Sequence, residues 1–384
     1  MTHHKKERLL QARRLEEQRG QFSRDLHNES RLRELREKHV AGNLTASESL
    51  ELILNGNSEH VSALKGAPMT AHQRYLKIMA GQADYLIVRC SDARIHKTDS
   101  EQDTLIGIHI YIAGNVIPGK KTASFEEIAQ VASLVRSDGA CLDEAHCNCG
   151  AVNERVKWVK GGMKPTGSDS LDCLLHEVMG PTPTDNAVAQ LSKMRNLPGL
   201  GGRATGALLY DWEKGGVTVV DANQSPVVEL LVDLFNKRHA DANSDGHLAE
   251  RLTKQKPHAI IIGSNLLPFS LSTITHASQN EVFQTTGSGN GLDEFDEGSI
   301  LYAIEHLGVR HIPFIAPGTS MNAEMVAAVF DQWEMDLRQM TVNGKPIIAN
   351  MLDSGELTIS RLRYDLTSGR LVPTGPAKPV ADTA

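Results

Sequence analysis

Residues 85–94 read YLIVRCSDAR, and this stretch decides the fold that we expect. Four apolar residues in a row, followed at once by polar ones, are typical of a short strand that is buried on both faces. Two further runs of this kind occupy 108–112 and 140–145. They are followed by helical patterns at 126–135 and 152–159. Strands that alternate with helices predict an α/β fold, a mostly parallel sheet with flanking helices.

Polar side chains stand where these predicted strands end. Cys90 and Asp92 follow the first, Ala113-Gly114-Asn115 follows the second, and His146 follows the third. Because ligands of parallel sheets lie at the carboxyl ends of the strands, these residues are candidates for one shared site.

The same pattern recurs later in the chain. Residues 207–220 and 362–372 both read as β-hairpins with Tyr-Asp before the turn, and 259–264 resembles the strand before Cys90. We therefore expect two tandem units that form an internal pseudo-dimer. The expected division is a charged helical arm at 1–44, a first unit at 45–222 and a second at 223–384.

Composition limits the function. The 384 residues carry a net charge of -7, which does not suggest a general nucleic-acid binder. No apolar run approaches the roughly 18 residues that span a bilayer, and the N-terminus has no apolar signal region. Five cysteines, an odd number, do not indicate a disulfide framework. We expect a soluble cytoplasmic protein without a membrane span.

Three residues form a candidate zinc site. Two thiolates and one imidazole, from Cys90, Cys149 and His146, are typical zinc ligands and leave a fourth position open for water. Cys147 competes with Cys149, but the spacing of Cys149 lets the chain turn back towards the metal. Bound zinc lowers the pKa of its water to about 7 and so supplies hydroxide, which attacks electrophilic carbon.

The motifs Cys90-x-Asp92-x-Arg94 and His146-x-x-Cys149-Gly150 resemble those of the β-class carbonic anhydrases, as does Ala113-Gly114-Asn115. The resemblance covers about 45–222, and 224–375 as a divergent copy. It implies that Zn²⁺ is the cofactor, held by the two cysteines and the histidine.

The resemblance also implies catalytic roles. Asp92 would accept a hydrogen bond from the zinc-bound water, and Arg94 would hold Asp92 in place. In some members the aspartate instead moves onto the metal. Gly114 is implied near substrate, and so, one residue out of register, is Gln82. The implied activity is that of a zinc lyase, which interconverts CO2 and bicarbonate.

Two other functions stay open. A hydrolase of carbon disulfide or carbonyl sulfide has the same ligands, and a non-catalytic scaffold would use the zinc structurally. Asp92 and Arg94 argue against the scaffold, since a structural zinc needs neither.

One strand departs from the expected pattern because Asp143 and Glu144 interrupt an apolar run. Glu144 and His146 are two residues apart and share a face of a strand. Glu144 is therefore expected either to orient His146 or a neighbouring basic group, or to be solvated where the strand ends early. Arg89 is a basic residue that can pair with one of these acids.

The second unit lacks the ligands, so we expect one metal per chain. The residues at the corresponding positions are Gly263, Asn265, Leu267, Pro317 and Ser320. The expected partners are a small molecule (CO2 or bicarbonate), further copies of the chain in a homo-oligomer, and a protein that docks on the arm; no nucleic acid is expected.

Overall fold

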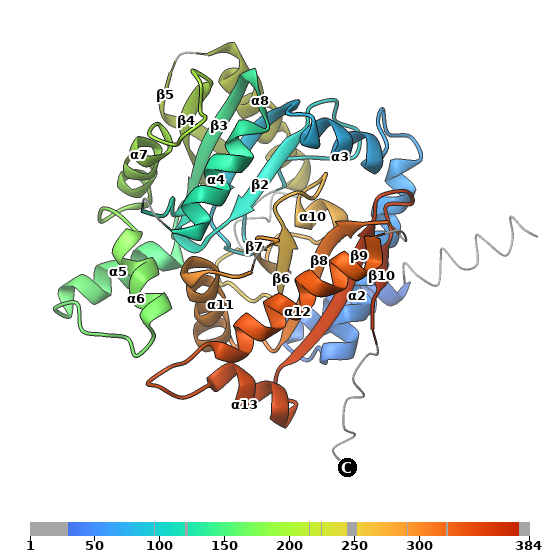
Figure 1. The fold of residues 1–384 in the computed structure, drawn as a ribbon, viewed down its shortest axis with the longest axis vertical. Helices are drawn as coiled ribbons and strands as arrows, with labels where there is room; N and C mark the ends of the chain where they lie inside the picture. Colours follow the sequence, from blue (N-terminus) through green and yellow to red (C-terminus); the bar gives the residue numbers. More distant parts are fainter. Residues whose placement is uncertain are drawn as a thin grey trace, which may run out of the picture.

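The computed structural model describes residues 30–375 apart from 96, 120–121, 215, 224, 244–251, 290 and 320–321. It contains two five-stranded, mostly parallel sheets flanked by helices, which confirms the predicted α/β class (Figure 1). Residues 1–29 of the predicted arm lie outside the described part, and so does Ser320.

The first sheet has the order β2-β1-β3-β4-β5. Its first four strands are parallel, and β5 is antiparallel to β4. The strands are β1 (Ala83–Arg89), β2 (Gly107–Tyr111), β3 (Val135–His146), β4 (Ala204–Asp211) and β5 (Gly216–Ala222). The helices within this part are α3 (Ala71–Met79), α4 (Ala123–Ser133), α5 (Gly150–Lys160), α6 (Asp169–Glu177) and α7 (Pro183–Met194).

The second sheet has the order β7-β6-β8-β9-β10, with β10 antiparallel to β9 and the other neighbours parallel. The strands are β6 (Ala259–Ser264), β7 (Val282–Gly287), β8 (His311–Gly318), β9 (Thr358–Asp365) and β10 (Leu371–Pro373). Its helices are α10 (Leu271–Ile274), α11 (Glu294–Leu307), α12 (Ala323–Gln339) and α13 (Ile347–Ser354). Strand for strand, this order matches that of the first sheet, as two copies of one unit would require; the duplication itself remains a prediction.

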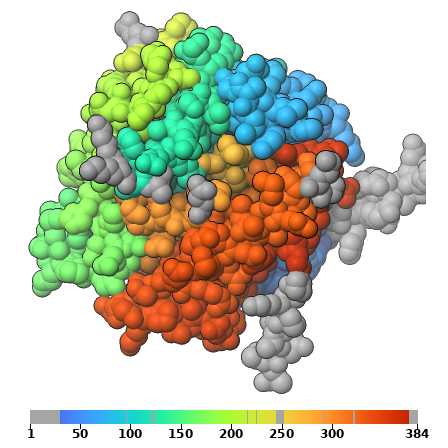
Figure 2. All heavy atoms as spheres, viewed as in Figure 1, coloured from blue at the N-terminus to red at the C-terminus, as the bar shows by residue number. Residues whose placement is uncertain are grey.

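Each sheet is covered by a helix that precedes the other sheet in the chain. Helix α2 (Ala46–Leu64) comes before β1, yet its Ile53 packs with Ile261 and Ile315 of the second sheet. Helix α8 (Pro226–Ala242) comes before β6, yet its Phe235 packs with Leu208 of the first sheet. Figure 1 shows α2 beside β9 and β10, and Figure 2 shows the blue and red parts of the chain adjoining at the surface.

The α2 contact uses an Asn-x-x-His pair. Asn57 Nδ2 donates to Gly369 O (3.1 Å), and Asn57 Oδ1 accepts from Leu371 N (2.8 Å). One turn further on, His60 Nε2 and Tyr364 Oη are 2.9 Å apart.

The α8 contact repeats this pairing on the first sheet. Asn236 Oδ1 accepts from Val217 N (2.6 Å), and Asn236 Nδ2 donates to Val217 O (3.0 Å). His239 Nδ1 and Tyr210 Oη are 3.1 Å apart. The Tyr-Asp hairpins singled out in the sequence are thus the places where the two crossing helices attach.

The described end of the predicted arm, residues 30–41, is helical and docks on the chain itself. Leu32 and Leu35 are buried against Leu52 of α2, and Arg36 Nε donates to Glu281 Oε1 (2.9 Å). Within the described residues, no helix combines the length and apolar character needed to cross a bilayer.

The edges of the two sheets meet at β2 and β7. Tyr111 N donates to Thr286 Oγ1, and Thr285 Oγ1 donates to Tyr111 O, both at 3.2 Å. One apolar core runs through this junction and contains Ile110 of β2 and Phe283 of β7. The carboxyl end of the first sheet therefore faces residues of the second.

Candidate metal centre

Cys90, His146 and Cys149 form a buried cluster whose ligand atoms all lie within 4.8 Å of one another. Cys90 directly follows β1, His146 ends β3, and Cys149 precedes α5. β1 and β3 are neighbouring parallel strands, so their carboxyl ends meet. It is the only cluster of at least three such ligands among residues whose positions are described.

The structure brings Cys149 to the cluster and leaves Cys147 outside it. Cys147 N donates to Tyr210 O (2.9 Å), which continues the β3–β4 pairing past His146. Asn148 then adopts a left-handed conformation with φ 54°, and this turn directs the chain back towards the ends of the strands. Cys149 is consequently placed beside Cys90.

The cluster fits a tetrahedral zinc ion. The two Sγ atoms are 3.8 Å apart. Zn–S bonds of about 2.3 Å at a tetrahedral angle require a separation of about 3.8 Å. His146 Nδ1 donates to Cys147 O (2.9 Å), so the neutral form of the ring carries its lone pair on Nε2, and that buried atom has no hydrogen-bond partner. These residues therefore suit a soft divalent cation.

The two thiols differ electrostatically. Burial raises the pKa of Cys90 well above its usual value. A hydrogen bond from Cys90, followed by N–H groups of the first turn of α5, lowers the pKa of Cys149. Helix N-termini stabilise thiolates, so Cys149 is the more readily ionised of the pair.

Asp92 and Arg94 form a closed ion pair next to the cluster. Arg94 donates three hydrogen bonds to the Asp92 carboxylate: from N and Nε to Oδ1, both at 2.9 Å, and from Nη2 to Oδ2 at 2.6 Å. Asp92 Oδ2 lies 3.6 Å from His146 Nε2. Burial favours the neutral acid, but His146 and Arg94 outweigh it and keep the pKa of Asp92 below its usual value. Asp92 is therefore a carboxylate held beside the metal position.

Trp212 contacts both Arg94 and His146, and no motif in the sequence pointed to it. The Arg94 guanidinium lies 4.8 Å from the centre of the indole, and the His146 ring stacks on it at 5.5 Å. Its position directly after Tyr210-Asp211, at the end of β4, is the only hint available in hindsight.

Gly114 lies at the cluster. Its N–H donates to Cys90 Sγ (3.1 Å), and its φ of 75° favours glycine. The next residue, Asn115, donates from Nδ2 to Asp143 Oδ2 (2.7 Å). Burial raises the pKa of Asp143 well above its usual value, and the carboxyl group serves the loop as a hydrogen-bonding partner of Asn115.

Glu144 is fully buried and lies beside Arg89. Arg89 Nη2 donates to Glu144 Oε1 (2.6 Å), and Arg89 Nη1 donates to Thr98 Oγ1 (3.1 Å). The strand continues to His146, so Glu144 is not solvated by an early strand end. Of the two expected partners, the geometry gives it the neighbouring basic group, while His146 Nδ1 bonds to a backbone carbonyl.

The structure places Gln82 away from the cluster. Gln82 is exposed and stands just before β1, whereas Cys90 follows the other end of that strand. A seven-residue strand separates the two by about 20 Å at roughly 3.3 Å per residue. A side chain at that end of the sheet does not reach the metal position.

Tyr302, on α11 of the second half, closes the cluster from the other side. A Cβ built on Gly150, the residue after Cys149, would lie 2.1 Å from Tyr302 Oη, so the hydroxyl occupies that space. Tyr302 also contacts His306 one turn further on, with ring centres 5.0 Å apart. Sequence reasoning missed this residue because nothing local links it to the motifs.

The corresponding end of the second sheet is filled by side chains. A Cβ on Gly263 would come within 2.4 Å of Leu271. Asn265 Nδ2 donates to Glu127 Oε1, and Leu267 is buried in an apolar cluster. No second set of at least three potential metal ligands lies there among the described residues.

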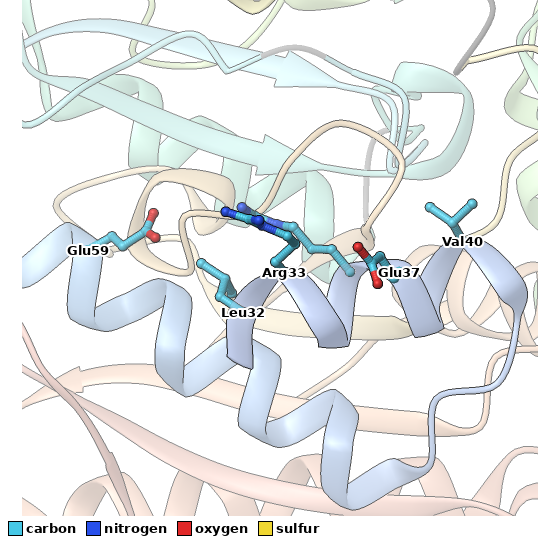
Figure 3. A pocket seen from close by; sticks show the side chains of 6 residues that line it. Leu32, Arg33, Glu37, Val40 and Glu59 are labelled. Carbon is cyan, nitrogen blue, oxygen red and sulfur yellow. The ribbon is translucent and has the colours of Figure 1, made fainter. Parts of the chain in front are cut away.

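Two cavities lie away from the metal ligands. One, of about 630 Å³, lies on the outer side of the helix at 30–41 and is lined by Leu32, Arg33, Arg36, Glu37, Val40 and Glu59 (Figure 3). The other, of about 910 Å³, is lined mainly by polar and charged residues, and its wall includes Asp99 and Gln279. No residue of the Cys90, His146 and Cys149 cluster contributes to either wall.

The chain matches no family model and no curated protein sequence. Similar solved structures include the β-carbonic anhydrase CcaA (TM-score 0.33, 15% identity, 39% of this chain and 96% of that one). They also include a Coccomyxa β-carbonic anhydrase (0.29, 17%, 39% and 86%) and a carbon disulfide hydrolase (0.28, 16%, 40% and 87%). These values are low, and the function of the chain is therefore argued from its own residues.

Proposed function

We propose that the chain is a zinc lyase that interconverts CO2 and bicarbonate. The observation that carries this proposal is the combination of a Cys90, His146 and Cys149 cluster with the Asp92–Arg94 pair beside it. A structural zinc site is closed by four protein ligands, whereas this cluster offers three, and its nearest acid is already engaged by arginine.

Asp92 and Arg94 would have different roles in the proposed reaction. Zinc, when bound, supplies a Lewis acid that makes a nucleophile from water near neutral pH. Asp92, as an ionised acceptor, orients a proton-bearing oxygen beside the cluster. Arg94 donates three hydrogen bonds to Asp92, and these keep that carboxylate from turning towards the metal position.

The second half would contribute the wall of the pocket. Tyr302 lies against Gly150, and Phe283 is 6.3 Å from Tyr302 between ring centres. Aromatic and apolar walls exclude bulk water and suit a small apolar molecule such as CO2. This supports the pseudo-dimer of units at 45–222 and 223–384; homo-oligomers of such chains remain a prediction for light scattering.

The test is an assay of the zinc-loaded chain on CO2, carbon disulfide and carbonyl sulfide. We expect CO2 hydration, and a loss of about a hundredfold in Asp92→Asn, because proton positioning contributes on that scale. Turnover of the sulfur compounds without CO2 hydration would make the chain a hydrolase. Bound zinc with no turnover at all would make it a scaffold.

A further inference from the structure

The metal-free half holds the backbone of the loop that carries Asp92 and Arg94. Three donors in residues 279–284 reach carbonyl oxygens of residues 91–94. They are Gln279 Nε2 to Arg94 O (2.8 Å), Asn280 N to Ala93 O (2.6 Å) and Gln284 N to Ser91 O (3.1 Å).

We propose that Gln279 is a positioning residue for the Asp92–Arg94 pair. It touches neither substrate nor metal in this account; it acts by fixing the carbonyl of Arg94. Its importance for turnover rests on the proposed function, but its effect on the loop does not.

The side chain of Gln279 is well placed for this role. Its Nε2 is also 2.8 Å from Tyr210 Oη, and that hydroxyl is 3.1 Å from His239 Nδ1 of α8. The carbonyl of Arg94 can only accept, so the amide nitrogen must face it. Gln279 thereby ties the loop to β4 and to a crossing helix at one point.

This backbone contact is found at only one of the two matching loops, so it is not a general feature of the packing between the two halves. The matching loop of the second half is 264–267. In the described part of the chain, its only backbone bond of this kind is internal, from Leu267 N to Ser264 O (3.2 Å). Among the described residues, the carbonyls of the loop beside the cysteine and histidine cluster are held from across the junction, whereas 264–267 is reached from there through the side chain of Asn265, which donates to Glu127.

Holding this carbonyl matters because the Asp92–Arg94 pair is local. Arg94 N donates to Asp92 Oδ1, and Ile95 N donates to Asp92 O (3.1 Å). A shift of the loop therefore moves the acid and its partner together, towards or away from His146. Releasing Arg94 O allows that shift.

The test is the isosteric change Gln279→Glu, which removes the donor and sets an acceptor against the carbonyl of Arg94. We expect amide hydrogen exchange at Arg94 and Ile95 to become about tenfold faster, the scale of one lost hydrogen bond. Exchange in β8 and β9 reports global unfolding and should not change. Gln82→Glu makes the same substitution at an exposed site far from the loop and serves as the matched control.

A second readout follows Asp92. In cobalt-substituted protein, Gln279→Glu should alter the visible absorption bands, because a released carboxylate changes the surroundings of the metal. At unchanged metal content, kcat for CO2 should fall about tenfold. Amide hydrogen exchange at Arg94 and Ile95 that stays within twofold of the wild type would show that Gln279 does not hold the loop. Faster exchange with unchanged bands would overturn its role in positioning Asp92, and both readings hold even if the wild type does not hydrate CO2.

Discussion

The carboxyl ends of β1 and β6 occupy the same place in two sheets of identical strand order, yet they differ in nearly every side chain. After β1 stand Cys90, Asp92 and Arg94; the corresponding positions at the end of β6 hold Gly263, Asn265 and Leu267. The same backbone position occurs in both sheets, but only the first carries side chains that can bind a metal. The second end has also been filled, since Leu271 takes the space that a thiol at 263 would need.

The contrast extends beneath the site. Arg89 pairs across to Glu144 in the first sheet, and Ile262 pairs across to Phe314 in the second. A buried ion pair thus supports the strand ends that carry ligands, and an apolar pair supports those that do not.

The largest effect is expected from removing a ligand. Cys149→Ala should reduce the zinc content from near one per chain to near zero, because two remaining ligands do not hold the metal. Cys147→Ala, two residues away and outside the cluster, should keep its zinc. Retention of zinc by Cys149→Ala, with loss in Cys147→Ala, would reverse the assignment.

Next comes the buried pair. Arg89→Leu should lower the free energy of unfolding by about 3–5 kcal/mol, because the buried Glu144 then loses the charge and the hydrogen bond of Arg89. The double variant Arg89→Leu/Glu144→Leu, which imitates the second sheet, should recover most of that loss. Urea titrations measure both; a double variant no more stable than the single one would show that the pair is not an independent unit.

Removing the asparagine of either crossing helix, α2 or α8, should lower the stability of the protein by a similar amount. Asn57→Ala and Asn236→Ala should each lower the free energy of unfolding by about 1–3 kcal/mol, since each leaves backbone groups of an outer strand unbonded. The sum should be additive because the sites lie in different sheets. Loss of stability in only one of them would break the proposed symmetry.

A smaller effect concerns pH at the filled end of the second sheet. Burial and the charge of Asp293 raise the pKa of Glu127 to about 8. The folded state thus keeps a proton that the unfolded state loses, so stability from this group is present below pH 4.5 and is lost as the pH rises through 8.

Glu127→Gln removes this dependence. Relative to wild type, the variant should gain about 1–2 kcal/mol between pH 5 and pH 9, less than the shift implies because Glu127 is partly exposed. Unfolding by urea at the two pH values measures it. An equal difference at both would place the titration elsewhere.

Much of the fold was predictable because buried parallel strands are visible in the sequence as apolar runs. The strand at 259–264 was located to the residue, and 85–88 lies within β1. That α2 and α8 each cover the sheet of the other half was not predictable, since the apolar face of an amphipathic helix does not indicate which sheet it packs against. The Asn-x-x-His spacing shared by both helices is visible in the sequence only once the contacts are known.

The candidate site divides in the same way. Cys90, His146 and Cys149 were found because they follow strands that must lie side by side. Tyr302, Trp212 and Gln279 were missed because they reach the site from other elements through tertiary packing. Gln82 was implied only by the family resemblance, one residue out of register, and it lies at the opposite end of β1 from Cys90.

We propose that one half of the chain holds a metal and that the other half holds the loop and the wall beside it. The most direct measurement is the zinc content of the full chain by elemental analysis, with and without the change Cys90→Ala. We expect one zinc per chain in the wild type and close to none in the variant. Two per chain, or one that persists without Cys90, would contradict it.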